Sequence, residues 1–209
     1  SLADIAKFGQ IPGNPKNAKH YFNHLLFNTD GSRFIFLHRW RVTGMSSFGT
    51  RMLTAKSDGT DIHIVDPHGK TSHFIWRDPK HILAWSAEPE GNFFHVYEDQ
   101  TGNVETIAEG VLTRDGHCTY SPDAEWILTD TYPDRERMQS LVLYRPSDGK
   151  LVELGRFYQE RPENNEWRCD LHPSWSRDGR SVCIDSKHSG QRQMYLLDVS
   201  EIILAGESE

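Results

Sequence analysis

Apolar and polar positions along this chain form short strand-like runs separated by turns rich in Gly, Asp, Ser and Pro. Those residues tolerate tight backbone geometry, so the pattern predicts hairpin-connected strands. The last apolar segment, residues 202–205, fits either a strand or a short helix. The expected strands are 21–28, 33–40, 50–57 and 61–67; 72–77, 81–88, 92–98 and 103–109; 116–121, 125–132, 137–145 and 150–157; and 171–176, 181–187 and 192–198.

Each group of strands opens with a histidine three residues before an aromatic residue. Successive motifs are 49, 44 and 55 residues apart. Spacings in this range indicate propeller blades, one four-stranded sheet per repeat. We therefore predict an all-β protein, a β-propeller with four blades at about 21–67, 72–109, 116–157 and 171–205, as a single domain over 1–209. The four motifs are His24-Leu-Leu-Phe27, His73-Phe-Ile-Trp76, His117-Cys-Thr-Tyr120 and His172-Pro-Ser-Trp175.

Composition narrows the class of protein. With 209 residues, 36% hydrophobic and 11% aromatic, the chain is expected to be globular and soluble. It has no run of 18 apolar residues, so we expect no membrane span. A net charge of −7, with both signs interspersed, argues against a nucleic-acid partner. The opening Ser-Leu-Ala, without Met or a leader, is typical of a processed or truncated chain and leaves cytoplasm and periplasm both open.

The repeated histidines are candidates for chemistry. The first strand of a propeller blade is innermost, so His24, His73, His117 and His172 would form an arc along the central channel. One interpretation is a polar, hydrated channel lining. The other is a working site, because imidazole is both a common metal ligand and a common general base.

His117, Cys169 and His172 look the most ligand-like. Cys169 lies three residues before His172, where a polar loop enters the blade and strand alternation need not hold. Three protein donors leave an open coordination position, and a thiolate favours zinc over manganese or calcium. Cys183 is assigned to the core, and Cys118 faces away from His117 if strand alternation holds.

Several segments together resemble the oligogalacturonate lyases and, more distantly, the propeller-type ulvan lyases. The resemblance implies a carbon–oxygen lyase of bacterial pectin and carbohydrate metabolism, which cleaves uronate-containing saccharides by β-elimination. It also implies a seven-bladed propeller, of which the four blades here would be the C-terminal part. The segments are Ser72–Arg77, His81–Trp85, Gly116–Asp123, Trp126–Pro133, Leu171–Gly179 and Met194–Asp198.

The resemblance also implies a divalent metal site. The ion would be held by His117, by Cys169 where the family has a glutamine, and by His172. A further histidine of the family is Ser174 here. The family implies manganese, whereas the thiol of Cys169 would bring zinc into consideration.

By the same resemblance, His73 is the catalytic base and Arg51 the arginine that assists it, with Arg39 as the other candidate for the arginine. His24 and Arg39 are candidate contacts to an anionic oligosaccharide. Arg39 belongs to a basic, aromatic stretch, His38-Arg39-Trp40-Arg41, which suits an acidic sugar.

Two other functions remain open. The Ser-Pro-Asp and Ser-Arg-Asp-Gly turns recur in non-catalytic bacterial propellers, such as that of the Tol translocation apparatus and the lids of prolyl peptidases, so a binding scaffold is one alternative. The chain has no Gly-x-Ser-x-Gly motif and is not itself a serine peptidase. The changes at Cys169 and Ser174 also allow a degenerate lyase relative with a structural metal.

Overall fold

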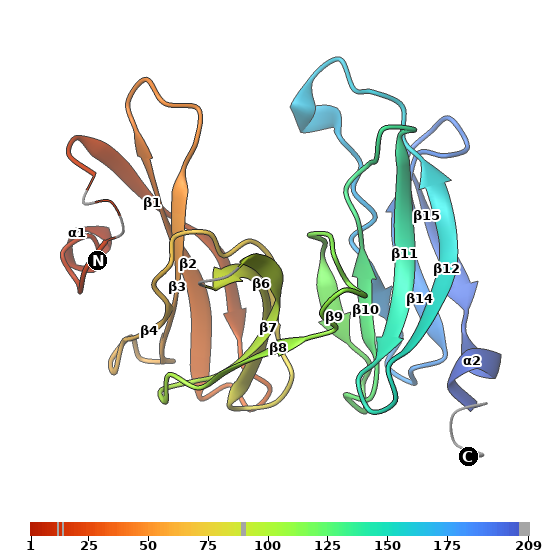
Figure 1. The fold of residues 1–209 in the computed structure, drawn as a ribbon, viewed down its shortest axis with the longest axis horizontal. Helices are drawn as coiled ribbons and strands as arrows, with labels where there is room; N and C mark the ends of the chain where they lie inside the picture. The colour runs from red at the N-terminus through yellow and green to blue at the C-terminus, as the bar shows by residue number, and fades with distance from the viewer. Residues whose placement is uncertain (12, 14, 89–90, 205–209) are drawn as a thin grey trace. The chain divides into compact units, whose positions relative to one another are not determined.

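The computed structural model describes residues 1–11, 13, 15–88 and 91–204, and within them it consists of antiparallel sheets with two short α-helices (Figure 1). Four sheets follow one another along the chain, and in each the strands are hydrogen-bonded in sequence order. This is the organisation of propeller blades, so the predicted all-β propeller with four blades is confirmed. The chain divides into two compact units, residues 1–113 and 114–209.

The first unit holds blades 1 and 2. A buried apolar layer joins their faces: Ile35 and Leu37 of blade 1 pack with Trp76, Ile82 and Ala84 of blade 2. Each expected strand of this unit is present within a few residues of its predicted bounds. Its elements are α1 Leu2–Ile5, β1 Ala18–Phe27, β2 Arg33–Val42, β3 Gly49–Lys56, β4 His63–Asp66, β5 Phe74–Trp76, β6 His81–Glu88, β7 Gly91–Glu98 and β8 Val104–Ile107.

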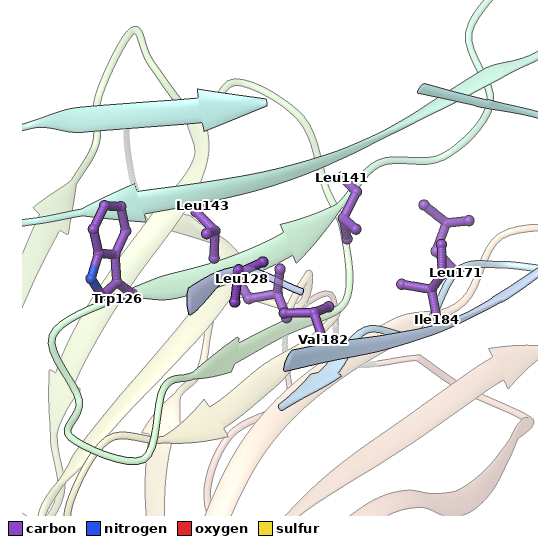
Figure 2. Packing of buried hydrophobic residues seen from close by; sticks show 8 residues of the cluster. Trp126, Leu128, Leu141, Leu143, Leu171, Val182 and Ile184 are labelled. Atoms are coloured by element: carbon purple, nitrogen blue, oxygen red, sulfur yellow. The ribbon is translucent and has the colours of Figure 1, made fainter. Parts of the chain in front are cut away.

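The second unit holds blades 3 and 4. Figure 2 shows their packing, with Trp126, Leu128 and Leu143 of blade 3 against Val182 and Ile184 of blade 4. Its elements are β9 Cys118–Tyr120, β10 Ile127–Asp130, β11 Met138–Arg145, β12 Lys150–Tyr158, the 3₁₀-helix η1 Asn165–Trp167, β13 Ser174–Trp175, β14 Ser181–Ser186, β15 Gln193–Asp198 and α2 Ser200–Leu204.

The C-terminal apolar segment, 202–205, belongs to a helix as far as it is described. Ile202 and Ile203 of α2 pack on the core of the second unit, and Ala205 lies outside the described residues. Blade 4 therefore has three strands among the residues that the structure describes. Within the same residues, no helix is long and apolar enough to span a membrane.

A buried arginine fastens the N-terminal segment to blade 1. Arg51 of β3 is fully buried and donates from Nη2 to the carbonyl of Ile5 (2.7 Å) and from Nη1 to the carbonyl of Gln10 (3.2 Å). Its Nε donates to Nδ1 of His38 (3.0 Å). Nδ1 of neutral His38 is therefore a hydrogen-bond acceptor, so the ring proton of His38 is on Nε2. This Nε2 lies 3.0 Å from Nδ1 of His20.

His38 should make the stability of the first unit depend on pH. Burial, then the charges of Arg51 and His20, lower the pKa of His38 from 6.5 to about 4. The unfolded chain therefore binds more protons between these values, so the stabilisation is complete above pH 6.5 and is lost as the pH falls toward 4. We expect a loss of about 3 kcal/mol between pH 7 and pH 4 from this group.

Denaturant unfolding of wild type and His38→Gln at several pH values measures this contribution. Glutamine keeps one acceptor and one donor but does not titrate, so the variant should show a smaller fall in unfolding free energy on acidification. Equal pH dependence in the two proteins would contradict the assignment to His38.

Gly116, which precedes β9, allows the backbone of Asp130 at the end of β10 to approach it closely. A Cβ atom at Gly116 would lie 1.8 Å from the backbone oxygen of Asp130 and 2.9 Å from its Oδ1. Gly116→Ala should therefore displace this backbone and lower the unfolding free energy of the second unit by more than about 2 kcal/mol. The matched control is Gly155→Ala in β12, where the added Cβ meets only the Phe157 ring at 3.3 Å. Comparable thermal unfolding of both variants would refute the predicted clash.

Candidate functional site

Three side chains of the second unit converge on one point. Potential ligand atoms of His117, Asp170 and His172 all lie within 4.8 Å of one another. His117 directly precedes β9 and His172 lies two residues before β13, so corresponding positions of blades 3 and 4 supply the two rings. Their centroids are 4.0 Å apart. The structure thus brings two of the three predicted metal ligands together.

Asp130, at the end of β10, orients both histidines. One carboxylate oxygen accepts from the backbone N–H of His117 (2.6 Å), and the other accepts from the backbone N–H of His172 (3.1 Å). The same carboxylate lies 3.0 Å from Nδ1 of His117. Since an ionised carboxylate only accepts hydrogen bonds, Nδ1 of His117 carries the proton and Nε2 is the nitrogen with a lone pair.

His172 is held in the same tautomer. Its Nδ1 lies 3.2 Å from the backbone carbonyl of Asp170, which can only accept, so Nε2 is again the unprotonated nitrogen. Partial desolvation of its ring, and then the neighbouring His117, lower the pKa of His172, although the residue is exposed on one side. Both effects favour neutral imidazole, which is the form that binds a metal ion.

Asp170 supplies an oxygen to the group. Its Oδ2 accepts from Arg168 Nε (2.9 Å) and Nη2 (2.7 Å). Its Oδ1 is buried and has no hydrogen-bond partner among the described residues. A carboxylate with one buried oxygen that lacks a donor, grouped with two imidazoles, fits a divalent cation. Two nitrogens and a carboxylate oxygen suit manganese or iron as well as zinc.

Cys169 does not belong to this group. Its side chain is buried, and burial raises the pKa of the thiol, which disfavours the thiolate that binds metals. Its backbone carbonyl accepts a hydrogen bond from Gln159 Nε2. Ser174, where the resemblance implies a further histidine, opens β13 and is exposed.

The other two repeated histidines meet in the first unit. His24 lies in a bulge of β1, where the pairing with β2 shifts between Asn23 and Leu26, and its φ is 50°. Its ring centroid is 6.3 Å from that of His73, which directly precedes β5. His73 is half-buried, with Nδ1 3.2 Å from the hydroxyl of Ser72. The candidate base and a candidate sugar contact are therefore neighbours.

The two candidate arginines lie in different surroundings. Arg51 is fully buried under the N-terminal segment, so it could touch a substrate only if the residues around Ile5 and Gln10 moved. Arg39 of β2 is half-buried, with its guanidinium carbon 4.9 Å from the ring centroid of the exposed Phe48. Arg41 approaches the same ring at 5.8 Å.

Asp130 and Asp170 are not among the sequence-based candidates, and the sequence holds a signal for Asp130 alone. Thr129 pairs with Cys118 across the β9–β10 hairpin, and that register places Asp130 beside His117. Asp170 lies in a segment outside the strands, and His172 has a φ of 43°, so strand alternation does not predict which residue of this segment faces the histidines.

No family model matches the chain, and no curated protein matches it. Solved structures do match. An oligogalacturonate lyase in complex with manganese has a TM-score of 0.68 at 18% identity, over 88% of this chain and 50% of its own. The oligogalacturonate lyase of Vibrio parahaemolyticus has a TM-score of 0.65 at 16% identity, over 87% and 50%.

Propellers of another kind match as well. TolB from Acinetobacter baumannii has a TM-score of 0.54 at 10% identity, over 87% of this chain and 52% of its own. At these identities the likeness shows the fold alone. The chain spans about half the length of these proteins and is similar to both lyases and TolB in being a β-propeller.

Proposed function

We propose that this chain carries the metal site of a lyase that cleaves uronate-containing oligosaccharides by β-elimination. The observation that supports this most is the group formed by His117, Asp170 and His172, in which a buried Asp170 oxygen has no donor. These three residues would hold the ion, and the similar lyase structure with manganese supports that metal. Cys169, the third ligand in the sequence-based prediction, lies outside this group.

The exposure of the group favours a site that accepts a substrate. His172 is exposed, whereas Asp170 is buried, so the group opens to solvent on one side. Three protein donors leave coordination positions for a ligand, while a structural metal is usually enclosed by four protein donors. The degenerate relative with a closed structural site is therefore the less favoured alternative.

β-Elimination needs a base and a way to stabilise negative charge on the uronate carboxylate. The base removes the proton α to the carboxylate, the electron pair forms a carbon–carbon double bond, and the glycosidic oxygen leaves. A bound divalent cation would supply Lewis-acid neutralisation of that carboxylate. We assign the base role to His73, which neighbours His24 as a second sugar contact. Arg39 is the accessible candidate arginine, and a role for Arg51 would require the N-terminal segment to move.

A binding scaffold is the competing function, and the likeness to TolB is the observation that favours it. A scaffold would need neither a metal bound at His117 and His172 nor a base at His73. Metal binding and turnover therefore separate the two functions.

Manganese binding should depend on Asp170 and not on Cys169. Asp170→Asn removes the charge of the buried ligand oxygen, so we expect Mn²⁺ affinity to fall by more than about 100-fold, as for His117→Ala and His172→Ala. Cys169→Ser is the matched neighbouring control and should leave affinity within about threefold, because the thiol is protonated. Titration calorimetry after chelator dialysis measures both. A loss confined to Cys169→Ser, or zinc retained only with the thiol, would restore Cys169 as the ligand.

Turnover should depend on His73. With Mn²⁺-loaded protein and oligogalacturonate, formation of the conjugated double bond can be followed by ultraviolet absorbance. His73→Ala should reduce kcat by about 10²- to 10⁴-fold and leave Mn²⁺ affinity unchanged, since it removes the proton acceptor only. His81→Ala, which breaks a surface pair with Asp78, is the control from the same unit. Unchanged kcat in His73→Ala would exclude it as the base, and no elimination by wild type that binds Mn²⁺ would favour the scaffold.

A further inference from the structure

Arg168 is the cation next to the metal-ligand group. It follows η1, is partly exposed, and holds Asp170 through Nε and Nη2, the two donors on one edge of the guanidinium. Burial alone would lower the pKa of Arg168, but its hydrogen bonds and charge attraction to Asp170, and then to Tyr132, outweigh burial and raise it. The side chain is therefore a permanent cation at the edge of the site.

Tyr132 fixes the plane of this guanidinium. The Arg168 Cζ atom lies 4.8 Å from the centroid of the Tyr132 ring, and that ring is in turn 6.0 Å from the ring of His117. Burial, and then the charge of Asp115, raise the pKa of Tyr132 to about 12, so its hydroxyl stays neutral. Stacking on one side and Asp170 on the Nε/Nη2 edge leave Nη1 as the donor that Asp170 does not use, and a further anion would meet this edge.

The site becomes less negative when a divalent cation binds. Asp115, Asp130 and Asp170 are carboxylates near Tyr132 and His117, and Arg168 is the cation that holds Asp170. A divalent cation held by the group would add two positive charges. Anion binding is thus more favourable in the loaded site than in the metal-free one.

We propose that Arg168 is the specificity-determining residue that binds the carboxylate of the acidic sugar through Nη1, while its other edge holds Asp170 in position. This rests on the proposed metal site and names the group that would select a uronate over a neutral sugar. Arginine suits the role because its rigid planar donors match a carboxylate, and lysine offers only a point charge.

The test is calorimetric titration of D-galacturonate, with D-galactose as the neutral control, into protein saturated with Mn²⁺. The monosaccharide has no glycosidic bond to cleave, so binding is measured without turnover. In wild type we expect galacturonate to bind at least tenfold more tightly than galactose, and only when Mn²⁺ is present. Arg168→Gln should lose most of this preference at saturating Mn²⁺, and Arg168→Lys should recover part of it.

Arg156→Gln is the matched control. Arg156 is exposed to the same extent as Arg168, 42% of its side chain, and it also forms a 2.7 Å pair with an aspartate, Asp134. This variant should keep the preference for galacturonate.

The outcomes separate the inference from the proposed function. If Arg168→Gln binds Mn²⁺ more weakly but, once saturated, binds galacturonate as wild type does, Arg168 only positions Asp170 and the inference is overturned. The inference is also overturned if Mn²⁺-loaded wild type does not prefer galacturonate over galactose. If wild type binds no Mn²⁺, the proposed function fails first and the inference fails with it.

Discussion

The candidate site depends on one buried carboxylate, that of Asp130. It accepts hydrogen bonds from the backbone N–H groups of His117 and His172 and contacts the His117 ring, so it joins the segments that enter blades 3 and 4. Removing a carboxylate from water is costly, and these N–H donors offset the cost. Gly116 is the condition for this arrangement, because a side chain there would occupy the position of the Asp130 backbone. The geometry of both imidazoles follows from this local packing.

The fold could be predicted from the sequence because its signals are local. Each hairpin has its own turn residues, and each blade begins with its own His-x-x-aromatic motif. The spacing of these motifs indicates propeller blades, and their number predicts four of them. The C-terminal helix α2 could not be predicted in the same way. This helix is five residues long, and its Ile202 and Ile203 side chains pack on the core of the second unit. For so short a helix, tertiary contacts outweigh intrinsic preference.

The histidines of the site could be predicted by equivalence within the repeat, and the structure places them in neighbouring pairs within each unit. The third donor depends on which side of an irregular segment each residue faces. The sequence predicts Cys169 as this donor, whereas the structure groups Asp170 with the histidines. The burial of Arg51 has no sequence signal at all. Its partners are backbone carbonyls of Ile5 and Gln10, and any residue type presents a carbonyl.

The proposed lyase function rests on the donor set and not on the fold, since propellers of both kinds match the chain. A scaffold gains nothing from the arrangement at Asp170. Leaving its Oδ1 buried without a donor costs about 1–3 kcal/mol, and a hydroxyl or amide neighbour would remove that cost. An unprotonated Nε2 of either imidazole cannot donate to that oxygen, but one ligand atom from each of the three residues can bind a single cation. A buried oxygen without a donor is unfavourable unless a cation binds it, so we expect this arrangement where a bound cation has a function. Under the proposed function, that cation would neutralise a uronate carboxylate beside Arg168.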